Sequence, residues 1–169
     1  MRFAPAAAAL SLALALSASG GFAAPRTATP RAADLLAVGE AALQAGDVQG
    51  AVDAYEAALA VDPGYTPTLL RLAEAARAAE LPGKAIGYYR EALAREPSNV
   101  DALAGEGSAL AEKGAVAKAR EKLALVQKVC GKSACAAADR LTAAIARGPR
   151  TVVKTAEVVL PDQQPVKTN

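Results

Sequence analysis

The feature that most constrains the fold is a period of 34 residues. The segments "GDVQGAVDAYEAALAVDP" and "ELPGKAIGYYREALAREP", which end at Pro63 and Pro97, align without a gap, and "GAVAKAREKLALVQKVCG" follows at the same spacing. The residues upstream of each segment agree as well, with Leu35, Leu69 and Leu103 in equivalent positions. A fixed period of this length indicates a solenoid of repeated structural units. The sequence therefore predicts three copies of one unit.

Each unit is expected to form two antiparallel helices. Alanines such as Ala51 and Ala58 recur where two helices must approach closely, and a larger side chain there would force the pair apart. Prolines and glycines fall between the apolar stretches, where helices begin and end. The expected helix pairs are 32–45 with 48–61, 66–79 with 82–95, and 100–113 with 116–129. On the second helices, the spacing predicts packing against the next unit's first helix for Tyr55, Tyr89 and Leu123.

The third unit departs from the pattern. Glu106 stands where an apolar residue is usual, and Gly131 stands where the unit-ending proline should be. The next segment, "SACAAADRLTAAIARG", is not a fourth repeat but one amphipathic helix, expected at 133–147 and stopped by Gly148-Pro149. A stack of repeats leaves its last apolar face open, and a covering helix closes it. This segment is therefore expected to cap the stack.

The three units resemble the tetratricopeptide repeat (TPR), a helix–turn–helix unit of about 34 residues. The resemblance implies an all-α, TPR-like helical solenoid with repeats at 32–65, 66–99 and, in divergent form, 100–131, followed by a capping helix at 132–148. In this family the first helices of the pairs line a concave groove that binds peptides. Mapped onto this sequence, the groove positions are Leu36, Glu40, Leu43, Leu70, Glu74, Arg77, Ala104, Ser108 and Ala111.

The groove positions bear on the kind of ligand. They are apolar at the start and acidic in the middle, and they lack the Lys/Asn pattern by which some family members hold a C-terminal carboxylate. An extended or helical segment with Leu or Val anchors and a basic residue would suit them better. The alternative is that each of these residues is a partly buried stacking residue with no ligand.

The N-terminus has the order of a secretory signal peptide. Arg2 precedes a run of Ala and Leu, and small residues follow up to Ala23. The run is too short to span a bilayer, which needs about 20 apolar residues, so we expect cleavage after Ala23 and no membrane anchor. This interpretation makes 1–23 a signal peptide and 24–31 a linker, and it places the protein in the periplasm. The alternative is an ordinary buried helix, which Ser17 to Gly21 would end at once.

The two cysteines, Cys130 and Cys135, admit four interpretations. In a continuous helix they would point about 140° apart, but Gly131 is expected to break the helix and to let the side chains meet. In an oxidising compartment this favours a structural disulfide that holds the cap helix down. A redox-active pair usually has two intervening residues, and two thiolates without histidine are half a metal-ligand set. Two free thiols remain the last alternative.

The residue content argues against enzymatic chemistry. There is no histidine, so a Ser/His/Asp or Cys/His nucleophile system is impossible, and "GEGSALAEKG" lacks the spacing of a phosphate-binding loop. Carboxylates such as Glu40, Asp47, Asp53 and Glu56 are expected on solvated helix faces or turns. With 19 basic and 17 acidic residues the chain has no general attraction for nucleic acid. No catalytic residue, cofactor or metal site is predicted.

Two functions of different class follow. The first is a non-enzymatic periplasmic adaptor or scaffold that binds an unidentified protein or peptide in the cell envelope. The second is a structural subunit of an envelope assembly through self-association, such as a dimer that stacks its caps. A thiol–disulfide factor that uses the two cysteines is a weaker third hypothesis. The tail 149–169, rich in Val, Thr and Gln, is expected to be flexible, or else to bind as a strand or lie along the repeats.

Overall fold

The computed structural model describes residues 26–150. Within this part the chain forms seven helices and no strand. They are α1 (Pro30–Gln44), α2 (Val48–Val61), α3 (Thr66–Ala78), α4 (Pro82–Arg95), α5 (Val100–Glu112), α6 (Val116–Cys130) and α7 (Ala136–Arg147). The expected all-α repeat solenoid is confirmed, and the first six helices begin and end within two residues of their expected bounds. The expected signal peptide, 1–23, and most of the tail lie outside the described residues.

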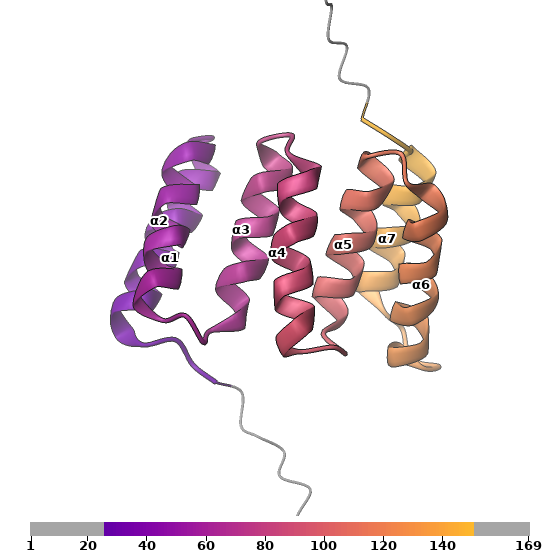
Figure 1. Cartoon of the computed structure of the whole chain (residues 1–169), viewed down its shortest axis with the longest axis horizontal. Helices are drawn as coiled ribbons and strands as arrows, with labels where there is room; N and C mark the ends of the chain where they lie inside the picture. Colours follow the sequence, from indigo (N-terminus) through magenta and orange to yellow (C-terminus); the bar gives the residue numbers. More distant parts are fainter. Residues whose placement is uncertain (1–25, 151–169) are drawn as a thin grey trace, which may run out of the picture.

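The helices stand side by side as a row of antiparallel pairs (Figure 1). Pairs α1–α2, α3–α4 and α5–α6 follow one another along the long axis, and α7 packs against both α5 and α6 at the C-terminal end. The single helix therefore covers the last pair, as a cap should. It begins at Ala136, three residues later than expected, because residues 131–135 form the turn after α6 and Cys135 has extended backbone angles.

Local sequence signals explain where helices begin and how the turns between them are made. The side chain of Asp47 accepts a hydrogen bond of 2.9 Å from the backbone N–H of Gly50 and caps α2, and Asn99 caps α5 in the same way through Ala102. The turn inside each unit needs one residue with a left-handed backbone. Gly46 and Gly114 supply it in the first and third units, whereas the second unit uses Glu80 at φ +59°.

Aromatic rings on the second helices fill the spaces between units. Tyr55 is fully buried: its ring lies so close to Gly39 of its own unit that a methyl group there would overlap it, and it shares a core cluster with Leu72 and Ala75 of the next unit. Tyr89 lies equally close to Gly105 of the next unit's first helix, which agrees with the expected packing direction. At the C-terminal end, Leu141 of α7 packs onto α5. The core is therefore continuous from α1 to α7.

Glu106 stands at a repeat position where an apolar residue is usual, and its carboxylate is buried. It is 1% exposed, and its oxygens pair with Arg90 of α4 at 2.9 Å and with Lys122 of α6. The equivalent residue one unit earlier is the buried Leu72. An ion-pair cluster thus replaces a hydrophobic contact between the second and third units.

Candidate functional site

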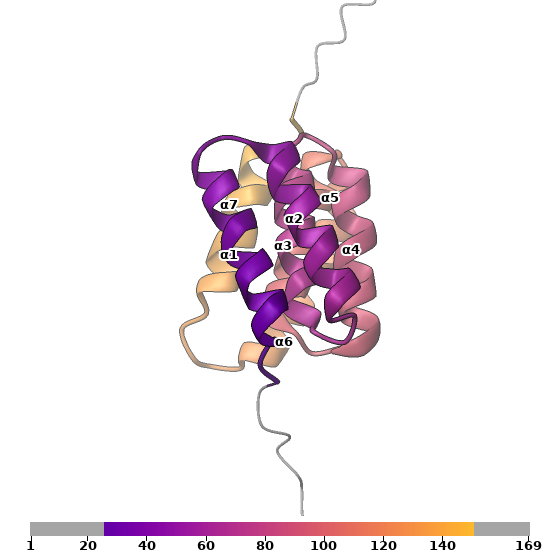
Figure 2. The same ribbon diagram turned by 90° about the vertical axis from the view of Figure 1, so that its left-hand side faces the viewer.

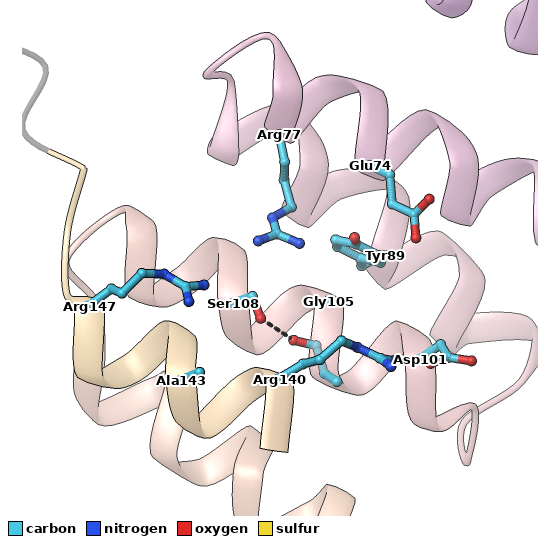
Figure 3. Close-up of a pocket in the computed structure, with 10 residues that line it drawn as sticks. Glu74, Arg77, Tyr89, Asp101, Gly105, Ser108, Arg140, Ala143 and Arg147 are labelled. Carbon is cyan, nitrogen blue, oxygen red and sulfur yellow. Dashed lines mark hydrogen bonds and ion pairs between the residues drawn. The ribbon is translucent and has the colours of Figure 1, made fainter. Parts of the chain in front are cut away.

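The main candidate is a pocket of about 280 Å³ where α3, α5 and α7 meet (Figure 3). We call it the α5 pocket, because α5 forms its floor and the other helices form its walls. Its lining combines charged side chains with small ones, which leave the space open. The residues are Glu74 and Arg77 of α3, Tyr89 of α4, Asp101, Ala104, Gly105 and Ser108 of α5, and Arg140, Ala143 and Arg147 of α7.

Arg77 is held on the α3 wall by a carboxylate of the next unit. Its Nη2 and Nε donate hydrogen bonds of 2.6 and 3.3 Å to the carboxylate of Glu112, which is buried at the end of α5. Burial alone would lower the pKa of the Arg77 guanidinium, but the hydrogen bond with Glu112 raises that pKa above its ordinary value. The side chain is therefore a fixed cation at the edge of the pocket.

The cap helix contributes two further cations. Arg140 pairs with Asp101 at 2.6 Å across the pocket mouth. Arg147 has no carboxylate within ion-pair distance among residues 26–150. Figure 3 shows Arg77 and Arg147 extending from opposite walls toward the space above Ser108. Two cations that face one space can bind a negatively charged or strongly polar group between them.

Tyr89 and Ser108 shape the pocket between these charges. The Tyr89 ring is buried against Gly105, and burial raises the pKa of its hydroxyl although Arg77 acts in the opposite direction. The Ser108 hydroxyl donates a hydrogen bond of 2.9 Å to the backbone carbonyl of Ala104. Its oxygen keeps acceptor capacity for a ligand. The pocket is therefore built to recognise polar groups and offers no activated nucleophile.

The structure brings four of the sequence-derived groove residues together. Glu74, Arg77, Ala104 and Ser108 all line the α5 pocket. Leu36 and Glu40 lie apart, at a shallow hollow between the start of α1 and the segment before it. Leu43, Leu70 and Ala111 pack in or against the core clusters, Ala111 with no exposed surface. The pocket thus occupies the second and third units and excludes the first.

Sequence reasoning missed the part of the site that α7 supplies. Arg140, Ala143 and Arg147 stand at i, i+3 and i+7 and so share one helix face, next to the face that buries Leu141 and Ala144. This spacing was the available signal. Tyr89 and Asp101 were also absent from the mapped groove, because Tyr89 belongs to a second helix and Asp101 stands outside the mapped first-helix positions.

The cysteine turn lies at the foot of the cap. Cys130 ends α6, Gly131 follows with φ +64°, and Cys135 precedes α7. The Cα atoms are 6.1 Å apart and the two Sγ atoms are at covalent bonding distance. This separation is within the range that disulfides adopt. The expected break at Gly131 is therefore present, and it lets the two side chains meet.

The described part of the chain bears on two other kinds of site, a metal site and a membrane-spanning helix. No cluster of three or more histidine, cysteine, aspartate or glutamate side chains could hold a metal ion there. None of the helices from α1 to α7 is long and apolar enough to cross a membrane. Asp47 serves as a helix cap, and Asp53 and Glu56 are exposed on α2. Glu40 pairs with Arg71 on the surface.

Comparison with known proteins identifies the architecture. No family model and no curated protein matches the sequence. Solved TPR domains do match in structure. The Sgt2 TPR domain from Aspergillus fumigatus has a TM-score of 0.64 at 24% identity, over 70% of this chain and 79% of that one. The TPR2B domain of yeast Sti1, solved in a complex with pHsp70, has a TM-score of 0.63 at 20% identity, over 70% and 98%.

A bacterial protein is similar in structure as well. The type III secretion chaperone SycD of Yersinia enterocolitica, solved with a peptide of the translocator YopD, has a TM-score of 0.61 at 18% identity, over 68% of this chain and 89% of that one. All three alignments cover 68–70% of this chain. The chain therefore has the tetratricopeptide-repeat fold.

Proposed function

We propose that this protein is a non-enzymatic adaptor that binds a segment of another protein in the α5 pocket. The observation that carries the proposal is the convergence of Arg77 and Arg147 on a space of about 280 Å³ between α3, α5 and α7. Three helices of different units position this space, so its shape depends on the folded stack. Such a pre-formed cavity with a few fixed polar groups is typical of a binding site.

The structural neighbours support the same class of function. Both Sti1 and SycD were solved with a bound partner or peptide, and the first TPR of Spaghetti (RPAP3) was solved with an HSP90 peptide. For this chain we infer a protein segment that places a carboxylate or another polar acceptor between the two arginines. This ligand differs from the basic segment that the groove sequence suggested, because the arginines of α7 change the charge of the site.

We place this adaptor outside the cytoplasm, in the periplasm of its host. The support is the order of charges, apolar residues and small residues in 1–23, together with a cysteine pair whose sulfurs are at bonding distance. In that compartment Cys130 and Cys135 form a disulfide that fixes the turn between the last repeat and the cap. The partner is then a protein of the cell envelope.

A crosslinking experiment tests the binding site. A photoreactive amino acid replaces Ala143, which is exposed in the pocket, or Ala124, which is exposed on α6 away from it. Irradiation in envelope extract should join a partner to the chain at position 143 only. The variant Arg147→Glu should abolish this product, whereas Arg120→Glu, with the same charge change outside the pocket, should retain it. Crosslinks at position 124 alone would place binding elsewhere.

A further inference from the structure

The charges of the described chain are divided unevenly along the row of helices. Residues 26–99, which include α1 to α4, contain seven basic and ten acidic residues, whereas residues 100–150 contain nine basic and five acidic ones. The two halves therefore carry net charges of opposite sign. The contrast is strongest around α6, because the segment 113–132 has six basic residues and Glu121 as its single acidic residue.

The basic side chains of this segment include three exposed lysines without a carboxylate partner. Lys118 and Lys128 are exposed on α6, which lies at the C-terminal end of the row, and Lys132 is exposed in the turn that follows (Figures 1 and 2). None of the three has a carboxylate within ion-pair distance among residues 26–150. Lys122, by contrast, is half-buried and pairs with Glu106.

Two apolar side chains lie on the same exposed side of α6. Leu125 and Val129 are each 45% exposed, and they follow Lys118 at i+7 and i+11, which places the three residues in one line along the helix. In the second unit the equivalent positions hold Glu91 and Arg95, which pair with each other on the surface. We call the exposed side of α6 with its turn the basic face, which consists of Lys118, Leu125, Lys128, Val129 and Lys132.

The first unit has the apolar residues of this face without its charges. The positions of Leu125 and Val129 hold Ala57 and Val61 there, and Val61 is 38% exposed. An exposed valine at this repeat position is therefore ordinary for the chain. What distinguishes α6 is the set of lysines beside it, since the equivalents of Lys118, Lys128 and Lys132 are Gly50, Ala60 and Gly64.

Lysines beside exposed apolar side chains on one helix face are typical of proteins that lie on an anionic membrane surface. The ammonium groups meet the headgroup phosphates, and the apolar side chains enter the boundary between headgroups and acyl chains. The division of charge along the row also favours an extended charged surface, because such a surface attracts the basic half, repels the acidic half and so orients the whole molecule. A short acidic peptide would contact one patch and gain little from that division.

We propose that the basic face docks on a membrane surface that contains anionic phospholipids. The contact is peripheral, since it uses the exposed side chains of a helix that stays packed on α5. The lining of the α5 pocket comes from α3, α4, α5 and α7, so α6 can meet a membrane without contributing to that pocket. The inference goes beyond the proposed binding function, because it gives the adaptor a place: a partner held in the pocket is held at a membrane surface.

Co-sedimentation of the full chain with lipid vesicles tests this proposal. Vesicles of phosphatidylcholine and phosphatidylglycerol in equal parts should bind the chain about tenfold more tightly than vesicles of phosphatidylcholine alone, and added salt should weaken this binding. Val129→Glu should reduce binding to the anionic vesicles about tenfold, because it places a negative charge against the headgroups. Val61→Glu is the matched control: it makes the same change at the equivalent position of the first unit, and binding should survive it.

A second pair of variants tests the charges alone. Lys128→Gln should weaken binding to the anionic vesicles about fivefold, which is the effect of one lysine near such a surface. Arg31→Gln removes an exposed cation from α1 and should leave binding unchanged. The apolar run near the N-terminus is identical in all of these chains, so a difference between them is due to the exchanged side chain.

The remaining outcomes are decisive as well. If Val129→Glu lowers the melting temperature, Leu125→Glu on the same face takes its place, with the same expected loss of binding. Equal binding of wild type to the two kinds of vesicle overturns the proposal, and so does binding that the α6 variants leave unchanged. A chain that ignores anionic vesicles but binds soluble polyglutamate would assign the lysines to an acidic protein and not to a membrane. None of these results depends on ligand binding in the α5 pocket.

Discussion

Arg77 and Glu112 belong to different units, and the two hydrogen bonds between them, of 2.6 and 3.3 Å, join the end of α3 to the end of α5. The chain also returns to this pair after the cap. The backbone N–H of Arg150 donates to the carbonyl of Glu112 at 3.1 Å, and its guanidinium donates to the carbonyl of Arg77 at 3.2 Å. The pocket wall and the end of the cap are therefore fixed by one polar cluster.

Glu112→Ala should destabilise the protein by about 2 kcal/mol. Breaking a fully buried ion pair would cost more, because Arg77 remains partly exposed. The mutation leaves the Arg77 guanidinium without its carboxylate in a half-buried place. Chemical denaturation with circular dichroism measures the loss. Glu91→Ala, which breaks the exposed pair with Arg95 on α4, is the control and should change stability by less than about 0.5 kcal/mol. Equal effects would show that the Arg77 pair is an ordinary surface ion pair.

Replacing either of two helical glycines by alanine should change the stability of the protein, in opposite directions for the two positions. Gly39→Ala places a methyl group 2.3 Å from a carbon of the Tyr55 ring, so the helices must move apart, and the change should cost about 1–3 kcal/mol of stability. Gly87→Ala lies on α4 with open space around it, so the better helix propensity of alanine should add about 0.5–1 kcal/mol. Thermal melting of the two variants beside wild type measures both signs. A neutral Gly39→Ala would mean that α1 and α2 can separate without loss.

Glu80→Gly should stabilise the protein by about 0.5–1 kcal/mol, since Glu80 adopts a left-handed backbone at φ +59° where the other two units have glycine. The measurement is the free energy of unfolding in urea. Glu96→Gly, at the end of α4 with φ −129°, has no such strain to relieve and should lose stability. A loss in Glu80→Gly of the same size would show that the side chain of Glu80 matters more than its backbone.

The titration of the buried tyrosines predicts a loss of stability at high pH. Burial raises the pKa of both Tyr55 and Tyr89 above the ordinary value of 10.0. The folded state therefore holds these protons more tightly than the unfolded state. The contribution of these two tyrosines to stability is complete below pH 10 and is lost as the pH rises through their raised pKa values.

Phenolate absorbance should show this directly. In the folded protein part of the tyrosine absorbance should change only with alkaline unfolding, and Tyr89→Phe should shift the unfolding midpoint to higher pH. Tyr65→Phe, at a half-buried position, is the control and should leave the midpoint where it is. If all four tyrosines titrate together before the helical signal is lost, the buried rings are accessible and the prediction is wrong.

The fold could be predicted from the sequence because the 34-residue period specifies it. The 34-residue spacing of alanines, tyrosines and prolines determines helix pairs and their order, and Gly131 and the apolar face around Leu141 indicate a turn and a cap. The buried Glu106 was visible as a departure, but its partners Arg90 and Lys122 come from two other helices. Such a cluster depends on the distance between units, which periodicity does not give.

The candidate site was only partly predictable for the same reason. Positions mapped onto one helix per unit include Glu74 and Ser108, which do line the pocket. They also include Leu43 and Leu70, which pack against the core. Arg147 reaches the pocket because α7 packs against both α5 and α6, and no repeat position encodes where a capping helix is placed.

The turn after α6 gives the last prediction. Cys130 and Cys135 are five positions apart in the sequence, at the turn between α6 and α7, and in an oxidising compartment they should be joined within one chain. Non-reducing peptide mapping of the protein, isolated from an oxidising compartment, should recover the two cysteines in one linked fragment. Linkage between two chains, or two free thiols, would contradict this.

Replacing both cysteines by serine should lower the free energy of unfolding by about 1–3 kcal/mol, since the bond mainly restricts the unfolded chain and the loop is short. The helices should still form, because Leu141 and Ala144 keep the cap seated on the third unit. Reducing agent should lower the melting temperature of wild type to that of the double serine variant and leave the variant itself unchanged. A variant that loses all helical signal would show that the bond is needed for the cap to dock, and a wild type insensitive to reductant would show that the bond contributes nothing.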